Sequence, residues 1–141
     1  KSIAIDFAPV DGAMIFVAQS DEYSGVNTST DQVTFGGTYT AGAVTAGIQR
    51  TSVDSSTANA DTDRTHLAAS FAVNENLSVS YGMSTVEFES SGSVDQEDSG
   101  FAASYTMGSM SFGASVNASD NVSGTAGSDD THKEMSVAFA F

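Results

Sequence analysis

Long apolar runs, basic residues, cysteine and tryptophan are the main absences from this chain. No stretch approaches roughly 18 consecutive apolar residues, which excludes a transmembrane helix. It does not exclude a transmembrane β-barrel, because the apolar and polar residues of its strands alternate and average to an intermediate hydropathy. Only four residues are Lys or Arg, so the clustered positive charge that nucleic acid binding requires is missing. The lack of cysteine fits an oxidising compartment such as a cell envelope.

The residues that are present give a composition typical of strands and turns. Gly, Ser, Thr, Ala and Val dominate, whereas the strong helix formers Leu, Lys, Arg and Glu are scarce. Hydrophobic residues make up 40% of the chain, which predicts a folded protein despite a formal net charge of −14. The chain begins at Lys1 without a signal peptide, and we interpret it as a processed chain or a piece of a longer one.

Apolar and polar residues alternate along most of the chain and predict about nine β-strands. The expected strands cover residues 2–8, 13–22, 31–40, 43–53, 63–73, 77–89, 99–107, 110–119 and 135–141. Beyond Met83 the apolar phase moves to Val86 and Phe88, which predicts a bulge or a position at the rim. Because side chains alternate between the two faces of a strand, Arg50 is expected on the same apolar face as Val44 and Ile48.

The last expected strand has one apolar face, formed by Met135, Val137, Phe139 and Phe141. Such a strand suits a membrane barrel, in which edges pair and the apolar face meets lipid. The opposite faces of the expected strands carry almost only Gly, Ser, Thr, Ala, Asn or Gln. We therefore predict an all-β, antiparallel transmembrane β-barrel with a polar lumen. The alternative is a secreted β-sandwich binding module, whose outward positions should carry many more charges.

Short and long connections alternate along the chain. The short ones are residues 9–12, 41–42, 74–76 and 108–109, and the long ones are centred on residues 23–30, 54–62, 90–98 and 120–130. Of the 18 acidic residues, all but Asp6, Asp11 and Glu75 lie in or beside the long connections. Because membrane barrels have short periplasmic turns and long extracellular loops, this division predicts a strongly acidic outer end.

Three charged or titratable residues on polar strand faces are candidates for the lumen wall: Asp6, Arg64 and His66. Arg64 and His66 share one face of a strand, where they would bias ion selectivity. The alternative for Arg64 is a weak, screened ion pair at the rim with Asp61 or Asp63.

The acidic loops hold a candidate cation site, because hard cations such as Ca²⁺ or Mg²⁺ prefer clustered oxygens. Its residues are Asp95, Glu97, Asp98, Asp129 and Asp130, and a solvated charge cluster is the alternative. No EF-hand, zinc-site or catalytic-triad spacing occurs, so we predict no catalytic residue and no other cofactor.

The aromatic residues of the apolar faces gather near the short turns. In a barrel they would form the periplasmic aromatic girdle, and in a soluble core they would be packing residues. The expected girdle residues are Phe7, Tyr39, Phe71, Tyr105, Phe112, Phe139 and Phe141.

The terminal strand ending in Phe141 resembles the signal read by the outer-membrane assembly machinery. The strand rhythm, the acidic loops and the hairpin around Gly108 are similar to the trimeric general porins of alphaproteobacteria. The resemblance spans essentially the whole chain but matches only the C-terminal half of a barrel of about 16 strands. In these porins the pore wall facing the constriction loop carries a row of arginines called the arginine ladder. In this chain Arg64 is the best candidate for a member of that ladder.

This resemblance implies one barrel segment over residues 1–141, without separate domains. It also implies a homotrimer in the outer membrane of a Gram-negative bacterium, in contact with lipid and lipopolysaccharide. The implied function is passive diffusion of small hydrophilic solutes and ions, with cations preferred because of the acidic rim. A small barrel of about eight strands with a structural or adhesive role is the alternative.

Overall fold

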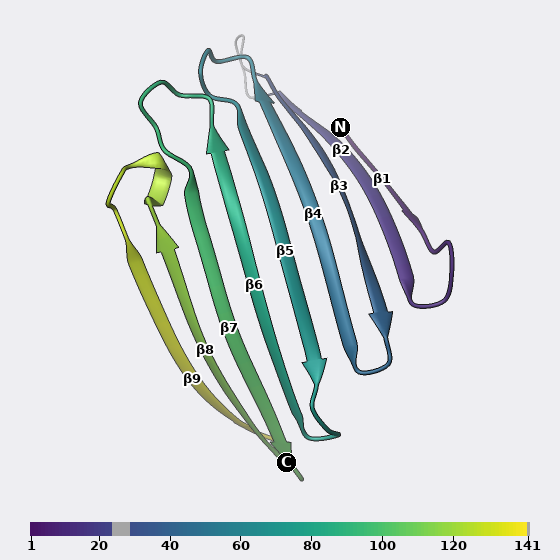
Figure 1. The fold of residues 1–141 in the computed structure, drawn as a ribbon. Coiled ribbons are helices and arrows are strands. Elements are labelled where there is room, and N and C mark those ends of the chain that lie inside the picture. Colours follow the sequence, from purple (N-terminus) through teal and green to yellow (C-terminus); the bar gives the residue numbers. More distant parts are fainter. Residues whose placement is uncertain (24–28, 141) are drawn as a thin grey trace.

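The structure is a computed structural model that describes residues 1–23 and 29–140. These residues form a single antiparallel sheet of nine strands that lie side by side in chain order (Figure 1). The strands are β1 (Ser2–Phe7), β2 (Ala13–Tyr23), β3 (Ser29–Ala41), β4 (Val44–Ser55), β5 (Thr62–Ala72), β6 (Leu77–Phe88), β7 (Gln96–Met107), β8 (Met110–Asp120) and β9 (Asp130–Phe139). A short 3₁₀ helix, η1 (Val122–Gly124), lies between β8 and β9. The predicted all-β, antiparallel class and the nine strands are confirmed.

The short connections all lie at one end of the sheet, and the described long ones lie at the other (Figure 1). The long connection between β2 and β3 falls mostly outside the described residues. In the described part of the chain, no helix has the length and apolarity needed to cross a membrane.

Several strands extend further toward the long loops than the apolar alternation predicts. β9 begins at Asp130 because Asp130 still pairs with Ser119, and β7 begins at Gln96 opposite Val86. At the start of β9, main-chain hydrogen bonds continue the ladder between the polar residues Ser119 and Asp130. The bulge considered beyond Met83 does not form, since the register of β6 with β5 is continuous.

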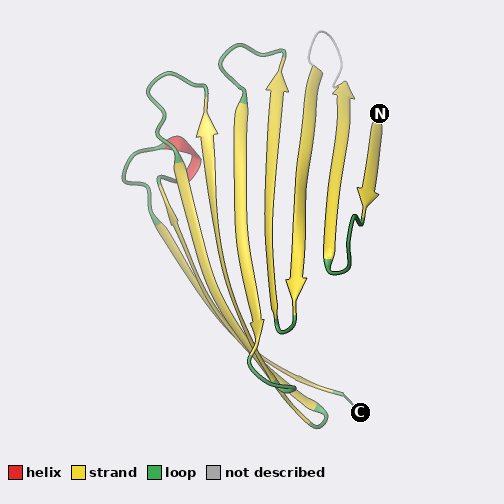
Figure 2. Cartoon of the chain, turned by 45° about the vertical axis from the view of Figure 1, so that its right-hand side comes forward, coloured by secondary structure: helices red, strands yellow, loops and turns green. Residues whose placement is uncertain are grey.

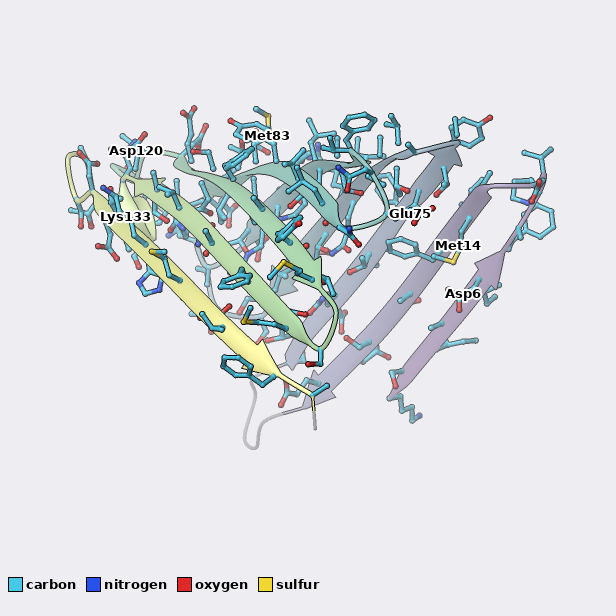
Figure 3. All side chains as sticks on the ribbon, turned by 90° about the horizontal axis from the view of Figure 1, so that it is seen from below. Asp6, Met14, Glu75, Met83, Asp120 and Lys133 are labelled. Carbon is cyan, nitrogen blue, oxygen red and sulfur yellow. The ribbon has the colours of Figure 1, made fainter. Side chains whose placement is uncertain are left out.

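The sheet is strongly curved, with one convex and one concave face (Figures 2 and 3). Met83 projects from the convex side (Figure 3), and its face carries the large apolar side chains. Typical rows on this face are Tyr81–Phe101–Val116 and Ile48–Leu67–Met83. Ile5 is 64% exposed and Phe101 is 49% exposed, so nothing in the described chain covers this face. A soluble protein seldom leaves so large an apolar surface open.

The described residues contain almost no interior core. Val86, 5% exposed, is the one large apolar side chain among them that is buried. In a β-sandwich a second sheet would cover the apolar face. The described strands form a single sheet, which does not fit that alternative.

Candidate functional site

The concave face is a wall of short polar side chains that pair across neighbouring strands. Four pairs of hydroxyl oxygens lie within hydrogen-bonding distance: Thr34 and Thr51 at 3.0 Å, Thr40 and Thr45 at 2.9 Å, Ser78 and Ser104 at 2.8 Å, and Thr106 and Ser111 at 3.3 Å. These bonds satisfy the hydroxyls within the wall. The result is a smooth, hydrophilic and largely neutral surface.

The three candidate lumen residues all lie on this concave face. Asp6 is opposite Phe16 in β2, while Arg64 and His66 lie two residues apart on the same side of β5. The side chains of all three are exposed. Asp6 is four strands from β5, roughly 19 Å at the usual strand spacing, so the structure does not bring the three together. Lining of a lumen by these residues stays a prediction.

Arg64 does not make the rim ion pair that the sequence left open. Within the described residues its side chain forms no salt bridge with Asp61 or Asp63. Asp63 lies on the opposite face of β5, where its partner is Arg50. Adjacent residues of a strand point to opposite faces, and this separates Arg64 from Asp63.

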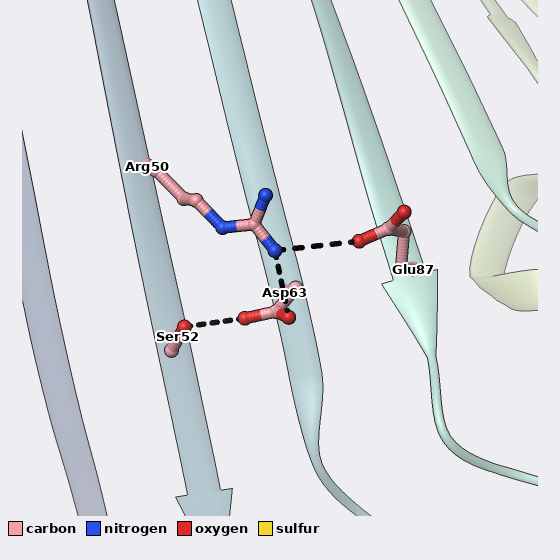
Figure 4. Close-up of polar contacts among 4 residues, drawn as sticks. All are labelled: Arg50, Ser52, Asp63 and Glu87. Atoms are coloured by element: carbon pink, nitrogen blue, oxygen red, sulfur yellow. Dashed lines mark hydrogen bonds and ion pairs between the residues drawn. The ribbon is translucent and has the colours of Figure 1, made fainter.

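Arg50 forms an ion-pair cluster on the convex face, across β4, β5 and β6 (Figure 4). Its Nη2 atom is 3.0 Å from Oδ2 of Asp63 and 3.8 Å from Oε2 of Glu87. The Ser52 hydroxyl donates a hydrogen bond to the other oxygen of Asp63. The position of Arg50 on the apolar side of β4, predicted from its phase, is confirmed by its register with Phe35.

This cluster marks where the apolar band of the convex face ends. The row on the short-turn side of Arg50 is Ile48–Leu67–Met83, and the row on its long-loop side is Ser52–Asp63–Glu87. The side chains of Arg50 and Asp63 are 43% and 38% exposed, and exposed ion pairs of this kind contribute only about 0–1 kcal/mol to stability. The convex face therefore changes from apolar to charged within two cross-strand rows.

The six described girdle candidates lie on the convex face near the short turns. Their exposed fractions run from 39% for Phe112 to 62% for Phe7. Tyr105 is directly opposite Phe112, and Phe139 is opposite Met110. Phe141 lies outside the described residues. Contact of this aromatic row with a membrane interface stays a prediction.

The residues of the candidate cation site are distributed over different surfaces. Glu97 and Asp98 are adjacent in β7 and so point to opposite faces, Glu97 toward the convex one. Asp129 accepts a hydrogen bond from the main-chain N–H of Asn121 at 3.2 Å. No group of three or more His, Asp or Glu side chains within the described chain is arranged to hold a metal ion. Binding of Ca²⁺ or Mg²⁺ by these loops stays a prediction.

The connection between β8 and β9 folds against the concave face at the long-loop end (Figure 2). The Ser123 N–H donates to Oε1 of Gln96 at 2.9 Å, and the Val94 N–H donates to the carbonyl of Gly124 at 3.1 Å. A Cβ on Gly124 would lie 3.1 Å from the ring of Phe88, so the loop packs closely on β6. Two long loops are thus joined over the rim.

Sequence reasoning predicted a long loop here but missed that it is ordered. The available signal was a set of residues that tolerate a left-handed backbone: Asn121 has φ 56° and Gly124 has φ 74°. The Asn121 side chain also ties the loop, since its Nδ2 donates to the carbonyl of Asp95 at 3.1 Å. Such contacts depend on which loops the sheet brings together.

A hollow of about 480 Å³ lies on the concave side over β5 to β8. His66, Ser84, Asp98 and Asn117 are among the polar residues around it, and Gly82 lies in its floor. Oδ2 of Asp98 accepts a hydrogen bond from Ser84 at 2.9 Å. Asp98, predicted to lie in a loop, is therefore held within the wall.

No protein-family model and no curated protein sequence matches the chain. Among solved structures, the chain is similar to an engineered variant of the porin of Rh. blastica, with a TM-score of 0.69 and 16% sequence identity. The match covers 99% of this chain and 45% of the porin chain, so the chain spans less than half the length of that porin. At this level of identity the likeness concerns the fold, and the chain has a porin-like antiparallel sheet.

Proposed function

We propose that this chain is the C-terminal half of an outer-membrane porin that lets small hydrophilic solutes and ions diffuse passively. The observation that carries the proposal is the opposition of the two faces of the sheet. The convex face is apolar and uncovered, as lipid contact requires, and the concave face is a hydrogen-bonded polar wall. A barrel with these faces encloses water.

The open edges of the sheet support completion by further strands. Among the described strands, β1 and β9 each have a neighbour on one side only. Free edges expose unpaired main-chain groups, which a closed barrel removes. With about seven further strands the sheet would reach the size of a barrel of about 16 strands, with residues 1–141 as one continuous segment. A complete barrel of about eight strands is less well supported, because nine strands already leave the sheet open.

The proposed mechanism is size-limited diffusion biased by charge at the mouth. Acidic residues dominate the long-loop end and give the chain a net charge of −14, which raises the local concentration of cations. No chemical step is involved. We place the protein in the outer membrane of a Gram-negative bacterium, as a homotrimer inserted by the barrel-assembly machinery. Lipopolysaccharide would then surround the acidic loops.

The test is a conductance measurement on the full-length protein in planar lipid bilayers. We expect large current steps, often in groups of three, and a reversal potential in a salt gradient that indicates cation preference. The absence of steps from a correctly folded protein would favour a structural or adhesive barrel with a plugged lumen. Anion preference would contradict the role given to the acidic loops.

A further inference from the structure

A row of residues with minimal side chains crosses the concave face from β4 to β7. Gly47 is opposite Ala68, Ala68 is opposite Gly82, and Gly82 is opposite Gly100. At about 4.8 Å between strands, this row is roughly 14 Å long. The next row toward the long loops contains Gln49, His66, Ser84, Asp98 and Ser119. The side chains of that row rise beside a shallow trench.

The trench is open at Gly82. A Cβ placed there would come no closer than 3.6 Å to the carbonyl oxygen of Leu67 and 3.7 Å to the Cβ of Ala68. Gly36 and Gly100, on the same face, are instead covered by the side chains of Phe16 and Asn117, which a Cβ would meet at 2.6 Å and 2.5 Å. Gly82 is one of the residues that line the hollow of about 480 Å³ described above.

Two larger polar side chains beside the hollow have unused hydrogen-bonding capacity. In the described part of the chain, neither His66 nor Asn117 has a side-chain hydrogen bond, although hydroxyl pairs are bonded elsewhere on this wall. An imidazole and an amide each offer a donor and an acceptor. Asp98 adds a carboxylate whose direction is fixed by Ser84 and Gln96.

The donor set indicates the class of ligand. A bare metal ion is disfavoured, because no three acidic or His side chains gather here in the described residues. An anion is disfavoured by the charge of Asp98. A neutral polyol matches both parts of the hollow, since its hydroxyls pair with imidazole, amide and carboxylate while its C–H groups lie on the flat floor at Gly82.

We propose that this hollow is a weak subsite for a neutral, polyhydroxylated solute of disaccharide size, held by His66, Asn117 and Asp98. The volume of the hollow, about 480 Å³, falls within the usual range for small-molecule sites, roughly 300–1,000 Å³. The proposal rests on the proposed function in one respect, namely that the concave face lines the channel. A solute that binds here narrows the lumen and lowers the ion current.

The experiment measures single-channel current of the full-length protein in a planar bilayer while sucrose is added. Glycerol at matched viscosity corrects for bulk conductivity. We expect a saturable fall in current with sucrose. His66→Ala and Asn117→Ala should each raise the half-saturating concentration about three- to ten-fold, the usual effect of losing one hydrogen bond. Gln32→Ala is the control, because Gln32 lies on the concave face of β3, away from the hollow.

The outcomes separate the two proposals. If the wild-type channel conducts but sucrose acts only as glycerol does, the subsite does not exist. The same holds if the two variants respond to sucrose like the wild type and the Gln32 control. If no variant and no wild-type preparation conducts, although heat-dependent gel mobility shows folded barrels, the proposed channel function itself is overturned.

Discussion

Ala103→Arg is expected to destabilise the protein in a lipid bilayer by about 2–4 kcal/mol, whereas Ala102→Arg is expected to be tolerated. Ala103 lies on the convex face between Val79 and Ala114, in the middle of the apolar band. An arginine at the midplane of a membrane barrel costs about 2–4 kcal/mol when it faces lipid. Ala102 lies on the concave face between Ser80 and Ser115, where in the proposed channel the same side chain would extend into water.

These two variants form a matched pair, since they exchange the same residue for the same side chain at adjacent positions. Urea titration of the refolded full-length protein in lipid vesicles gives the difference in unfolding free energy. Equal stability of both variants would show that the convex face does not meet lipid. Greater damage at Ala102 would show that the concave face is the buried one.

Gly36→Ala is expected to cost about 1–3 kcal/mol of stability, which is the usual cost of overpacking. A Cβ at Gly36 would lie 2.5 Å from the main-chain carbonyl oxygen of Ile48 and 2.6 Å from the ring of Phe16. The carbonyl belongs to the ladder between β3 and β4 and cannot move freely. To accommodate the methyl group, the strands must separate locally and the ring must leave its position over the glycine.

Gly82→Ala is the control for this prediction. It lies on the same concave face in a strand interior, but its Cβ would make only ordinary contacts, the nearest at 3.6 Å. Since glycine is unfavourable inside a strand by roughly 0.5–1 kcal/mol, the alanine variant should match or exceed the wild type in unfolding free energy. Equal losses in both variants would mean that the packing of Phe16 on Gly36 is unimportant.

The alternation of side chains made the strands and their faces predictable. A period of two assigns each residue to a face once one apolar row is recognised, which is why the face of Arg50 followed from that of Ile48. The alternation did not predict where the strands end near the long loops. At Asp130 the ladder is held by main-chain hydrogen bonds, which leave no apolar signal in the sequence.

Features that join several strands could not be predicted, because they depend on register. The ion pairs of Arg50 with Asp63 and Glu87 connect three strands, and the sequence offered Asp63 as a partner of Arg64 instead. The hollow at Gly82 likewise requires four short residues from four strands to align. The concave positions of Arg64 and His66 depend only on alternation within β5, and they were predicted.

The most direct test of the account is a cysteine scan along β6 in the membrane-embedded, full-length protein. Residues 1–141 contain no cysteine, and any cysteine elsewhere in the full-length protein is first replaced by serine, so each introduced thiol reports on its own site. Ser80, Gly82 and Ser84 should react with a charged, water-soluble thiol reagent when replaced by cysteine. Val79, Tyr81 and Met83 lie on the exposed convex face and should not react, because lipid covers that face in the proposed barrel. Reaction at both sets, or only at the second set, would contradict a water-filled lumen on the concave side.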